Sequence, residues 1–112
     1  MDALHRALLH AAFDPCMVLK PDGTVLAVNQ PMCARLDRPE KMLVGCNVRE
    51  LFPEDVANRR MALLDNALQR GKRTTFEDEG RSGVTFEGVV QPLFSDNGEP
   101  KSLVVTIRDV TG

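Results

Sequence analysis

The last strand-like run of the chain, close to its C-terminus, is apolar on both of its faces. Successive side chains of a β-strand point to opposite sides of the sheet, so Leu103, Val105 and Ile107 share one face. Val104 and Thr106 lie on the other face, which is not strongly polar either. A strand of this kind has to be covered on both sides. The run therefore predicts a layered fold, with further structure packed on each face of a sheet.

Turn signals predict that this sheet is antiparallel. Pro21-Asp22-Gly23 separates two strand-like segments and predicts a β-hairpin, because proline presets φ and glycine permits a positive φ. Residues 80–83 and the pair Asn97-Gly98 predict two further turns. The expected strands are residues 16–20, 24–28, 73–79, 84–93 and 102–108. The fold class that we predict is α+β, a five-stranded antiparallel sheet with helices on one face and an N-terminal helix.

Helices are predicted from apolar periodicity and from capping residues. The N-terminal segment has Leu4, Leu8 and Ala11 on one helical face. Asn29 predicts the start of a short helix, and residues 53–70 have the clearest helical pattern. The apolar stripe of that longest helix is Ala57, Met61, Leu64 and Leu68. We expect the middle helices to cover one face of the sheet, and the N-terminal helix, a second copy of the chain, or both to cover the other.

Composition argues against several functional classes. The 112 residues suffice for one domain, and a net charge of −2 with scattered Lys and Arg argues against a nucleic-acid-binding face. No apolar run approaches the roughly 20 residues of a membrane span, and the N-terminus lacks the order of a signal peptide. A cytoplasmic domain without membrane contact is therefore expected. Cys16, Cys33 and Cys46 form no Cys-x-x-Cys motif, which favours buried free thiols over disulfides or a zinc site.

Five motifs, in order along the chain, resemble those of a PAS domain, the sensor module common in bacterial signalling proteins. The motifs are residues 18–29, 38–45, 51–55, 96–100 and 108–111, the last of which resembles the Asp-Ile-Thr that ends members of this family. The resemblance implies a five-stranded antiparallel sheet that holds a small cavity against its helices. It implies no particular ligand, because members bind haem, flavins, small acids, fatty acids or nothing.

The resemblance also implies a division of the chain. Residues 1–12 are expected to form an N-terminal helix that serves as linker and dimer contact, and residues 13–112 to form the PAS domain. The candidate dimer contacts are Leu4, Leu8 and Ala11. A homodimer is therefore expected.

The C-terminus predicts where the signal leaves the domain. The final strand leads directly into Asp109 and Thr111, and both residue types cap helix N-termini. An output helix and an effector domain are therefore expected beyond residue 112. Asp109 and Thr111 are the predicted signal-relay residues, with Asp109 paired with a basic group such as Arg108.

Cofactor motifs of the family match this chain only in part. The light-oxygen-voltage subclass needs a reactive Cys within Gly-x-Asn-Cys-Arg-Phe-Leu-Gln, but here Val48 has that position and Cys46 lies two residues earlier. Haem in this family is usually held by a His on the long helix, whereas the histidines here are His5 and His10. No cofactor is predicted, and a haem- or flavin-binding redox or gas sensor stays open as the alternative.

The expected cavity draws on apolar residues that could equally be plain core. The ligand-pocket candidates are Met32, Leu36, Val48, Leu51, Phe52, Met61, Leu64, Phe76, Phe86, Val105 and Ile107. Arg49, Arg59 and Arg60 could bind an anionic ligand, although helical arginines are usually surface groups. Cys46 lies close to Arg49 in sequence and is the candidate for a redox-sensitive thiol, with packing as the alternative.

The lack of catalytic motifs favours a sensory module over an enzyme. The sequence has no Gly-x-Ser-x-Gly, no His-Glu-x-x-His and no phosphate-binding glycine loop, and it lacks the phosphoacceptor and nucleotide motifs of a kinase. We therefore expect a non-catalytic input module of a larger protein, such as a sensor histidine kinase in a two-component phosphorelay. A small-molecule ligand is the other expected partner, and no metal site is predicted.

Overall fold

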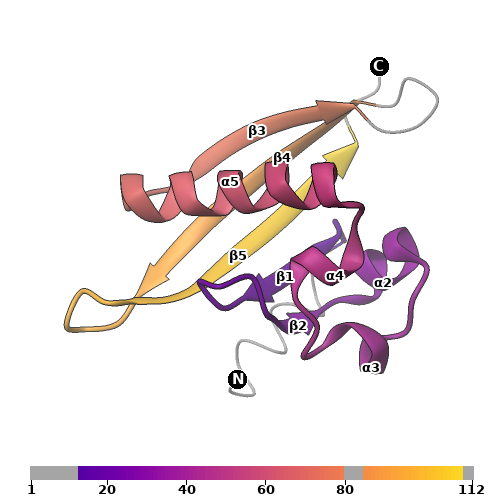
Figure 1. Ribbon diagram of the computed structural model, residues 1–112, viewed down its shortest axis with the longest axis horizontal. Coiled ribbons are helices and arrows are strands. Elements are labelled where there is room, and N and C mark those ends of the chain that lie inside the picture. The colour runs from indigo at the N-terminus through magenta and orange to yellow at the C-terminus, as the bar shows by residue number, and fades with distance from the viewer. Residues whose placement is uncertain (1–12, 80–84, 110–112) are drawn as a thin grey trace.

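The centre of the molecule is an antiparallel sheet of five strands (Figure 1). The computed structural model describes residues 13–79 and 85–109, and the predicted N-terminal helix (residues 1–12) and turn 80–83 lie outside these residues. The strands are β1 (Cys16–Leu19), β2 (Val25–Val28), β3 (Thr74–Glu79), β4 (Thr85–Phe94) and β5 (Pro100–Asp109). Their order across the sheet is β2-β1-β5-β4-β3. The predicted α+β class with a five-stranded antiparallel sheet is confirmed.

Strand β5 has the central position that its two apolar faces require. It pairs with β1 on one side and with β4 on the other, and the register aligns Val105 with Met17 and Val90. Residues directly opposite each other on neighbouring strands share a face, so these three buried side chains form a row across the sheet. The next position aligns Thr106 with Cys16 and faces the other side.

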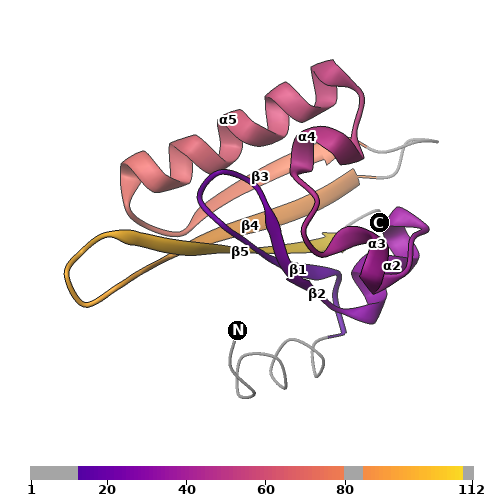
Figure 2. The same ribbon diagram turned by 60° about the horizontal axis from the view of Figure 1, so that its bottom comes forward.

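Helices cover one face and one end of this sheet in the described part of the chain. They are α2 (Gln30–Leu36), α3 (Glu40–Leu43), α4 (Val48–Leu51) and α5 (Glu54–Arg70). Figure 2 shows α5 and α4 over one face, with α2 and α3 at one end. As predicted, Asn29 caps α2: its side-chain oxygen accepts a hydrogen bond from the Met32 amide at 3.1 Å. The sequence predicts only short irregular segments over residues 38–52, where the chain forms the two single-turn helices α3 and α4.

Helix α5 buries one stripe against the sheet. The buried residues are Ala57, Met61, Leu64 and Ala67. The predicted fourth member of the stripe, Leu68, is only partly buried, because Ala67 faces the core in the last turn. The helix ends at Gly71, which has a φ of 67° and donates its N–H to the Ala67 carbonyl at 2.9 Å. We call the sheet face under α5 the inner face and the opposite one the outer face.

The outer face carries a second and smaller apolar cluster. Cys16 and Ala27 are buried there, and Val18 and Val104 pack against them. Both faces of β5 therefore hold apolar contacts, as its sequence predicts. Residues 1–12, which we expected to cover this face, lie outside the described residues.

The free edge of β2 is closed by the backbone that leads into α4. Val25 donates its N–H to the Cys46 carbonyl at 2.7 Å and accepts a bond from the Gly45 N–H at 2.9 Å. In a third hydrogen bond between the two segments, Val48 donates its N–H to the Gly23 carbonyl at 3.0 Å. Gly45 has a φ of 93°, and such a positive φ is a backbone conformation that favours glycine. The hairpin turn and α4 are thereby held together.

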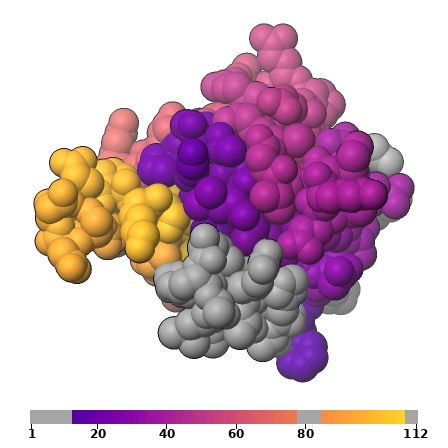
Figure 3. All heavy atoms as spheres, turned by 90° about the horizontal axis from the view of Figure 1, so that it is seen from below, coloured from indigo at the N-terminus to yellow at the C-terminus, as the bar shows by residue number. Residues whose placement is uncertain are grey.

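The hairpin between β4 and β5 projects at one end of the molecule, as Figure 3 shows from below. Its turn is closed by two bonds of 2.9 Å, from the Ser95 N–H to the Glu99 carbonyl and from the Gly98 N–H to the Ser95 carbonyl. Gly98 has a φ of 85°. The turn predicted from Asn97-Gly98 is confirmed.

Candidate functional site

A cavity of about 100 Å³ lies between the inner face of the sheet and helices α2, α4 and α5. Its lining residues form two groups that differ in exposure. The buried group, which we call the cavity floor, is Met17, Leu19, Met32, Val48, Leu64, Val90 and Val105. The group with partial or greater exposure, the cavity rim, is Arg35, Leu36, Phe52, Arg60, Leu63, Phe76 and Ile107. The cavity thus has an apolar interior and a more open border.

Strand register explains why the floor is apolar. Met17, Val105 and Val90 lie side by side on β1, β5 and β4, and their side chains share the inner face. Leu64 of α5 and Met32 of α2 close the floor from the helical side. Methionine side chains adapt to irregular gaps, so the two Met residues suit the uneven shape of the floor.

Gly88 of β4 determines where one side of the rim lies. Gly88 pairs with Phe76 of β3 and with Ile107 of β5, and these two neighbours belong to the rim. A Cβ atom on Gly88 would overlap the Phe76 ring. The ring therefore occupies the space above Gly88, and only glycine leaves that space free.

Two arginines on the rim lie against aromatic rings. The guanidinium carbon of Arg60, on α5, is 5.9 Å from the ring centre of Phe52 and 5.8 Å from that of Phe76. The guanidinium carbon of Arg35, on α2, is 3.8 Å from the ring centre of Phe86. All three distances fall within the range of cation–π attraction. Positive charge is thus held at the border of an apolar cavity.

Eight of the eleven pocket candidates line the cavity. They are Met32, Leu36, Val48, Phe52, Leu64, Phe76, Val105 and Ile107. Leu51, Met61 and Phe86 do not line it. Leu51 is partly buried and packs against the core, and Phe86 lies under Arg35. Met61 is directed to the first hairpin turn, where a Cβ on Gly23 would approach its sulfur to 2.9 Å.

Several lining residues are missing from the sequence-based candidates. They are Met17, Leu19, Arg35, Leu63 and Val90, while Arg60 was considered only as a possible anion ligand. Alternation in the first strand already places Met17 and Leu19 on one face, which is the signal that could have found them. Val90 follows only once its register with Val105 is known. No local signal distinguishes Arg35 from other helical arginines.

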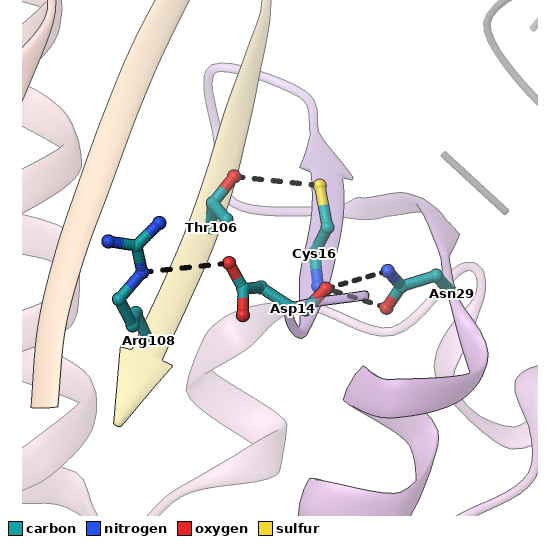
Figure 4. A network of polar contacts seen from close by, with 5 residues as sticks. All are labelled: Asp14, Cys16, Asn29, Thr106 and Arg108. Atoms are coloured by element: carbon teal, nitrogen blue, oxygen red, sulfur yellow. Dashed lines mark hydrogen bonds and ion pairs between the residues drawn. The ribbon is translucent and has the colours of Figure 1, made fainter. Parts of the chain in front are cut away.

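The buried side chain of Asn29 connects the entry into β1 with the start of α2 (Figure 4). Its Oδ1 accepts hydrogen bonds from the Cys16 amide at 2.9 Å and from the Met32 amide at 3.1 Å. Its Nδ2 donates to the Asp14 carbonyl at 2.9 Å. Asn29 is 1% exposed, so its polar groups depend on these protein partners. Because Met32 belongs to the cavity floor, the network begins at the cavity.

The same β1 entry is bound to the end of β5. The Pro15 carbonyl accepts a bond from the Ile107 N–H at 3.0 Å, and Arg108 Nε lies 3.8 Å from Asp14 Oδ2. We call the residues drawn in Figure 4 the terminal junction: Asp14, Cys16, Asn29, Thr106 and Arg108. The predicted pairing of Asp109 with Arg108, or with another basic group near the sheet, stays a prediction, and the contact described for Arg108 is the one with Asp14. The Asp109 side chain and Thr111 lie outside the described residues.

Two of the three thiols are buried, one in each apolar cluster. Burial raises the pKa of Cys16, on the outer face, while a hydrogen bond with Thr106 acts in the opposite direction. Burial also raises the pKa of Cys33, in the main core, with a smaller contribution from Glu40. Both groups are therefore protonated and unreactive thiols near neutral pH.

Cys46 and the other arginines lie away from the cavity. Cys46 is partly exposed rather than buried, and its thiol donates to the Met42 carbonyl at 3.2 Å. Arg49 donates to Asn58 Oδ1 at 2.8 Å, and Arg59 is exposed. Of the three arginines considered for an anion, only Arg60 reaches the cavity.

The model of the family described as "PAS fold" matches residues 9–112. The chain belongs to the PAS family. PAS domains are non-catalytic sensory modules of signalling proteins, so the cavity of this PAS domain lies in a module of that kind. No curated protein matches the chain significantly.

Solved structures agree with this PAS fold. The PAS domain of BvgS from Bordetella pertussis has a TM-score of 0.84 at 17% identity, over 97% of this chain and 85% of that one. A sensory box sensor histidine kinase from Vibrio cholerae has a TM-score of 0.80 at 22% identity, over 97% and 90%. VqmA, solved bound to DPO and described as a dimer in Vibrio cholerae, has a TM-score of 0.79 at 12% identity, over 98% and 58%.

Metal-binding clusters and membrane-spanning helices are both absent from the described part of this PAS domain. Within residues 13–79 and 85–109, no group of three or more His, Cys, Asp or Glu side chains is placed to hold a metal ion. Among the described helices, none is long and apolar enough to cross a membrane.

Proposed function

We propose that this PAS domain is the input module of a larger signal-transduction protein and that it senses a small molecule bound in the cavity. The observation that carries the proposal is the position of the cavity between β5 and α2. Val105 of its floor belongs to the strand that leads to the C-terminus, and Met32 of its floor is bonded to Asn29. A ligand that displaces either element also displaces the terminal junction. The binding of DPO by VqmA supports a small molecule as the ligand class.

The proposed output leaves through the residues after β5. In this proposal residues 13–112 are the PAS domain, residues 1–12 are an N-terminal helix, and Asp109 and Thr111 begin an output helix. The effector beyond residue 112 is proposed to be a histidine kinase of a cytoplasmic two-component phosphorelay, supported by the likeness to the sensor histidine kinase from Vibrio cholerae. In the full-length protein, Asp109→Ala should uncouple output from input, with Asp96→Ala as the exposed control. Unchanged output in Asp109→Ala would contradict the relay.

The proposed assembly is a homodimer. Leu4, Leu8 and Ala11 are the proposed contacts, and the VqmA dimer and the apolar outer face support this assembly. Light scattering of the purified chain should give the mass of a dimer, and Leu4→Glu with Leu8→Glu should give that of a monomer. A monomeric wild type at micromolar concentration would refute the dimer.

Native mass spectrometry with a denatured control tests the cavity as a ligand site. Extra non-covalent mass on the native protein, absent from a variant with a filled floor such as Val90→Phe, would support the proposal. A visible absorbance spectrum tests the haem- or flavin-binding alternative, which predicts a coloured protein. An apo protein to which no candidate ligand binds would contradict a sensory cavity and leave a domain that only associates and relays.

A further inference from the structure

A second cavity, of about 240 Å³, lies on the outer face of the sheet, and we call it the outer groove. Val89 of β4 and Thr106 of β5 are directly opposite each other in the strand register. Their neighbours Val90 and Val105 line the cavity on the inner face, so Val89 and Thr106 face the other way and form the floor of the groove. The other lining residues are all charged: Asp14, Arg73, Glu87 and Arg108. A guest in the outer groove therefore meets charges of both signs.

The outer groove lies against the terminal junction. Asp14, Thr106 and Arg108 belong to both, and Figure 4 shows them side by side at the end of β5. Arg108 Nε is 3.8 Å from Asp14 Oδ2, so the charges of these two residues partly offset each other. A guest in the outer groove would therefore touch the junction from the side opposite the cavity under α5.

The two remaining charges of the groove, Arg73 and Glu87, are not paired with each other or with the junction. Among residues 13–79 and 85–109, the structure shows no hydrogen bond or ion pair that involves either of these side chains. Both side chains are exposed. An exposed guanidinium group and an exposed carboxylate can each bind a guest group of opposite charge in a charge-assisted hydrogen bond.

The strand register sets the spacing of these two charges. Thr74 pairs with Val90, so Arg73, one residue earlier, lies level with residue 91 of β4. Glu87 is four residues from that level, which corresponds to about 13 Å along the strand at roughly 3.3 Å per residue. The two long side chains shorten this span, because both of them line the groove between them. Their spacing suits a guest with its two charges at opposite ends, whereas an α-amino acid has both charges on one carbon atom.

We propose that the outer groove binds a linear zwitterion such as an ω-amino acid, with its carboxylate at Arg73 and its ammonium group at Glu87. The alkyl chain between the two charges lies over the floor, Val89 and Thr106. A guest with a single charge leaves one of the two charged side chains without a partner. A diamine or a dicarboxylate meets a like charge at one end. This site goes beyond the proposed function, because it lies on the other face of the sheet from the cavity under α5.

The first test locates the binding by NMR spectroscopy of the methyl groups. Val89 faces the groove and its neighbour Val90 faces the inner cavity, so the two residues report on opposite faces of the sheet. Added 6-aminohexanoate should shift the methyl resonances of Val89 and Thr106 and leave those of Val90 unchanged. Shifts confined to Val90, or no shifts at all, would overturn the inference. Either result leaves the proposed ligand of the inner cavity to its own test by native mass spectrometry.

The same resonances give the affinity at the groove alone. Titrations followed at Val89 should show that hexanoate and hexylamine each bind about fivefold more weakly than 6-aminohexanoate, since each lacks one exposed ion pair. Added salt should weaken the binding of 6-aminohexanoate. Equal affinities of the three probes at Val89 would contradict a site for zwitterions.

The second test exchanges the two charges. Arg73→Gln and Glu87→Gln should each weaken the binding of 6-aminohexanoate about fivefold. Arg70→Gln and Glu77→Gln are the matched controls, because both residues are exposed and neither lines the groove. Arg73→Glu or Glu87→Arg alone should weaken binding further, and the two together should restore it, because a linear zwitterion can bind in the reverse direction. Unchanged affinity in both Gln variants, or no recovery in the double variant, would refute the assignment.

Discussion

The inner and outer faces of β5 have similar apolar residues but different neighbours. On the inner face, Val105 and Leu103 belong to the main core, and the packing leaves a cavity. On the outer face, Val104 joins a small cluster, and Thr106 and Arg108 contact the β1 entry. One strand thus borders the cavity on one side and carries two residues of the terminal junction on the other. In the proposed function, β5 is therefore a short physical route from a bound ligand to the output.

The largest expected difference between the faces is in stability. Leu103 is fully buried on the inner face, and its neighbour Val104 is partly buried on the outer face. Leu103→Ala should lower the free energy of unfolding by about 3 kcal/mol, since it leaves a cavity in the core. Val104→Ala should cost about 1 kcal/mol. Urea denaturation of both variants measures the two values, and equal losses would mean that the outer face is as tightly packed as the inner one.

Asn29 tests whether the two regions are coupled. Asn29→Ala removes the partners of the Cys16 and Met32 amides and of the Asp14 carbonyl, and should cost about 2 kcal/mol. Asn29→Asp retains the acceptor but places a buried carboxylate oxygen against the Asp14 carbonyl, so it should destabilise the protein as well. Hydrogen exchange should show faster exchange of the Cys16 and Met32 amides together in Asn29→Ala. If only one of the two amides exchanged faster, the coupling would be wrong.

Gly88 tests the shape of the inner face. Gly88→Ala should destabilise the protein by about 1–2 kcal/mol, because its Cβ displaces the Phe76 ring. The same substitution in a Phe76→Leu background should cost less, because the smaller side chain leaves room. Thermal denaturation of the four proteins gives the coupling between the two sites. Additive losses would show that Gly88 is needed for a reason other than the ring.

The smallest expected effects concern the three thiols, which differ in burial. Cys46 should react first with a thiol reagent at pH 8, because it is partly exposed while Cys16 and Cys33 are buried.

Burial raises the folded-state pKa of Cys16 and Cys33, so the folded protein keeps protons that the unfolded chain releases. Stability should therefore fall as the pH rises above the unfolded thiol pKa of about 8.5. Cys16→Ala should flatten this alkaline loss, and an unchanged pH profile would contradict it.

The sequence predicts the sheet well because its signals are local. Three features can be recognised from neighbouring residues alone: the alternation of side chains around Val105 and the turns at Gly23 and Gly98. All three predictions agree with the structure. The stripe of α5 is predicted for the same reason, apart from its last turn, where Ala67 replaces Leu68.

The candidate site is less predictable because it depends on distant contacts. Whether Leu51 or Phe52 reaches the cavity depends on how α4 is turned, and α4 is held by the hairpin turn through Val48 and Gly23. The partner of Arg108 is Asp14, at the opposite end of the described chain. No local pattern identifies such a pair, and the same is true of the two rim arginines.

The closed edge of β2 also affects solubility. An open sheet edge presents unpaired backbone groups to which another chain can add a strand. On the β2 side, the bonds of Val25 with Gly45 and Cys46 already use such groups. The β2 edge therefore offers fewer free backbone groups to a second chain than an open edge would. Strand addition between copies is thereby restricted at Val25, although the central strand of the same sheet is strongly apolar.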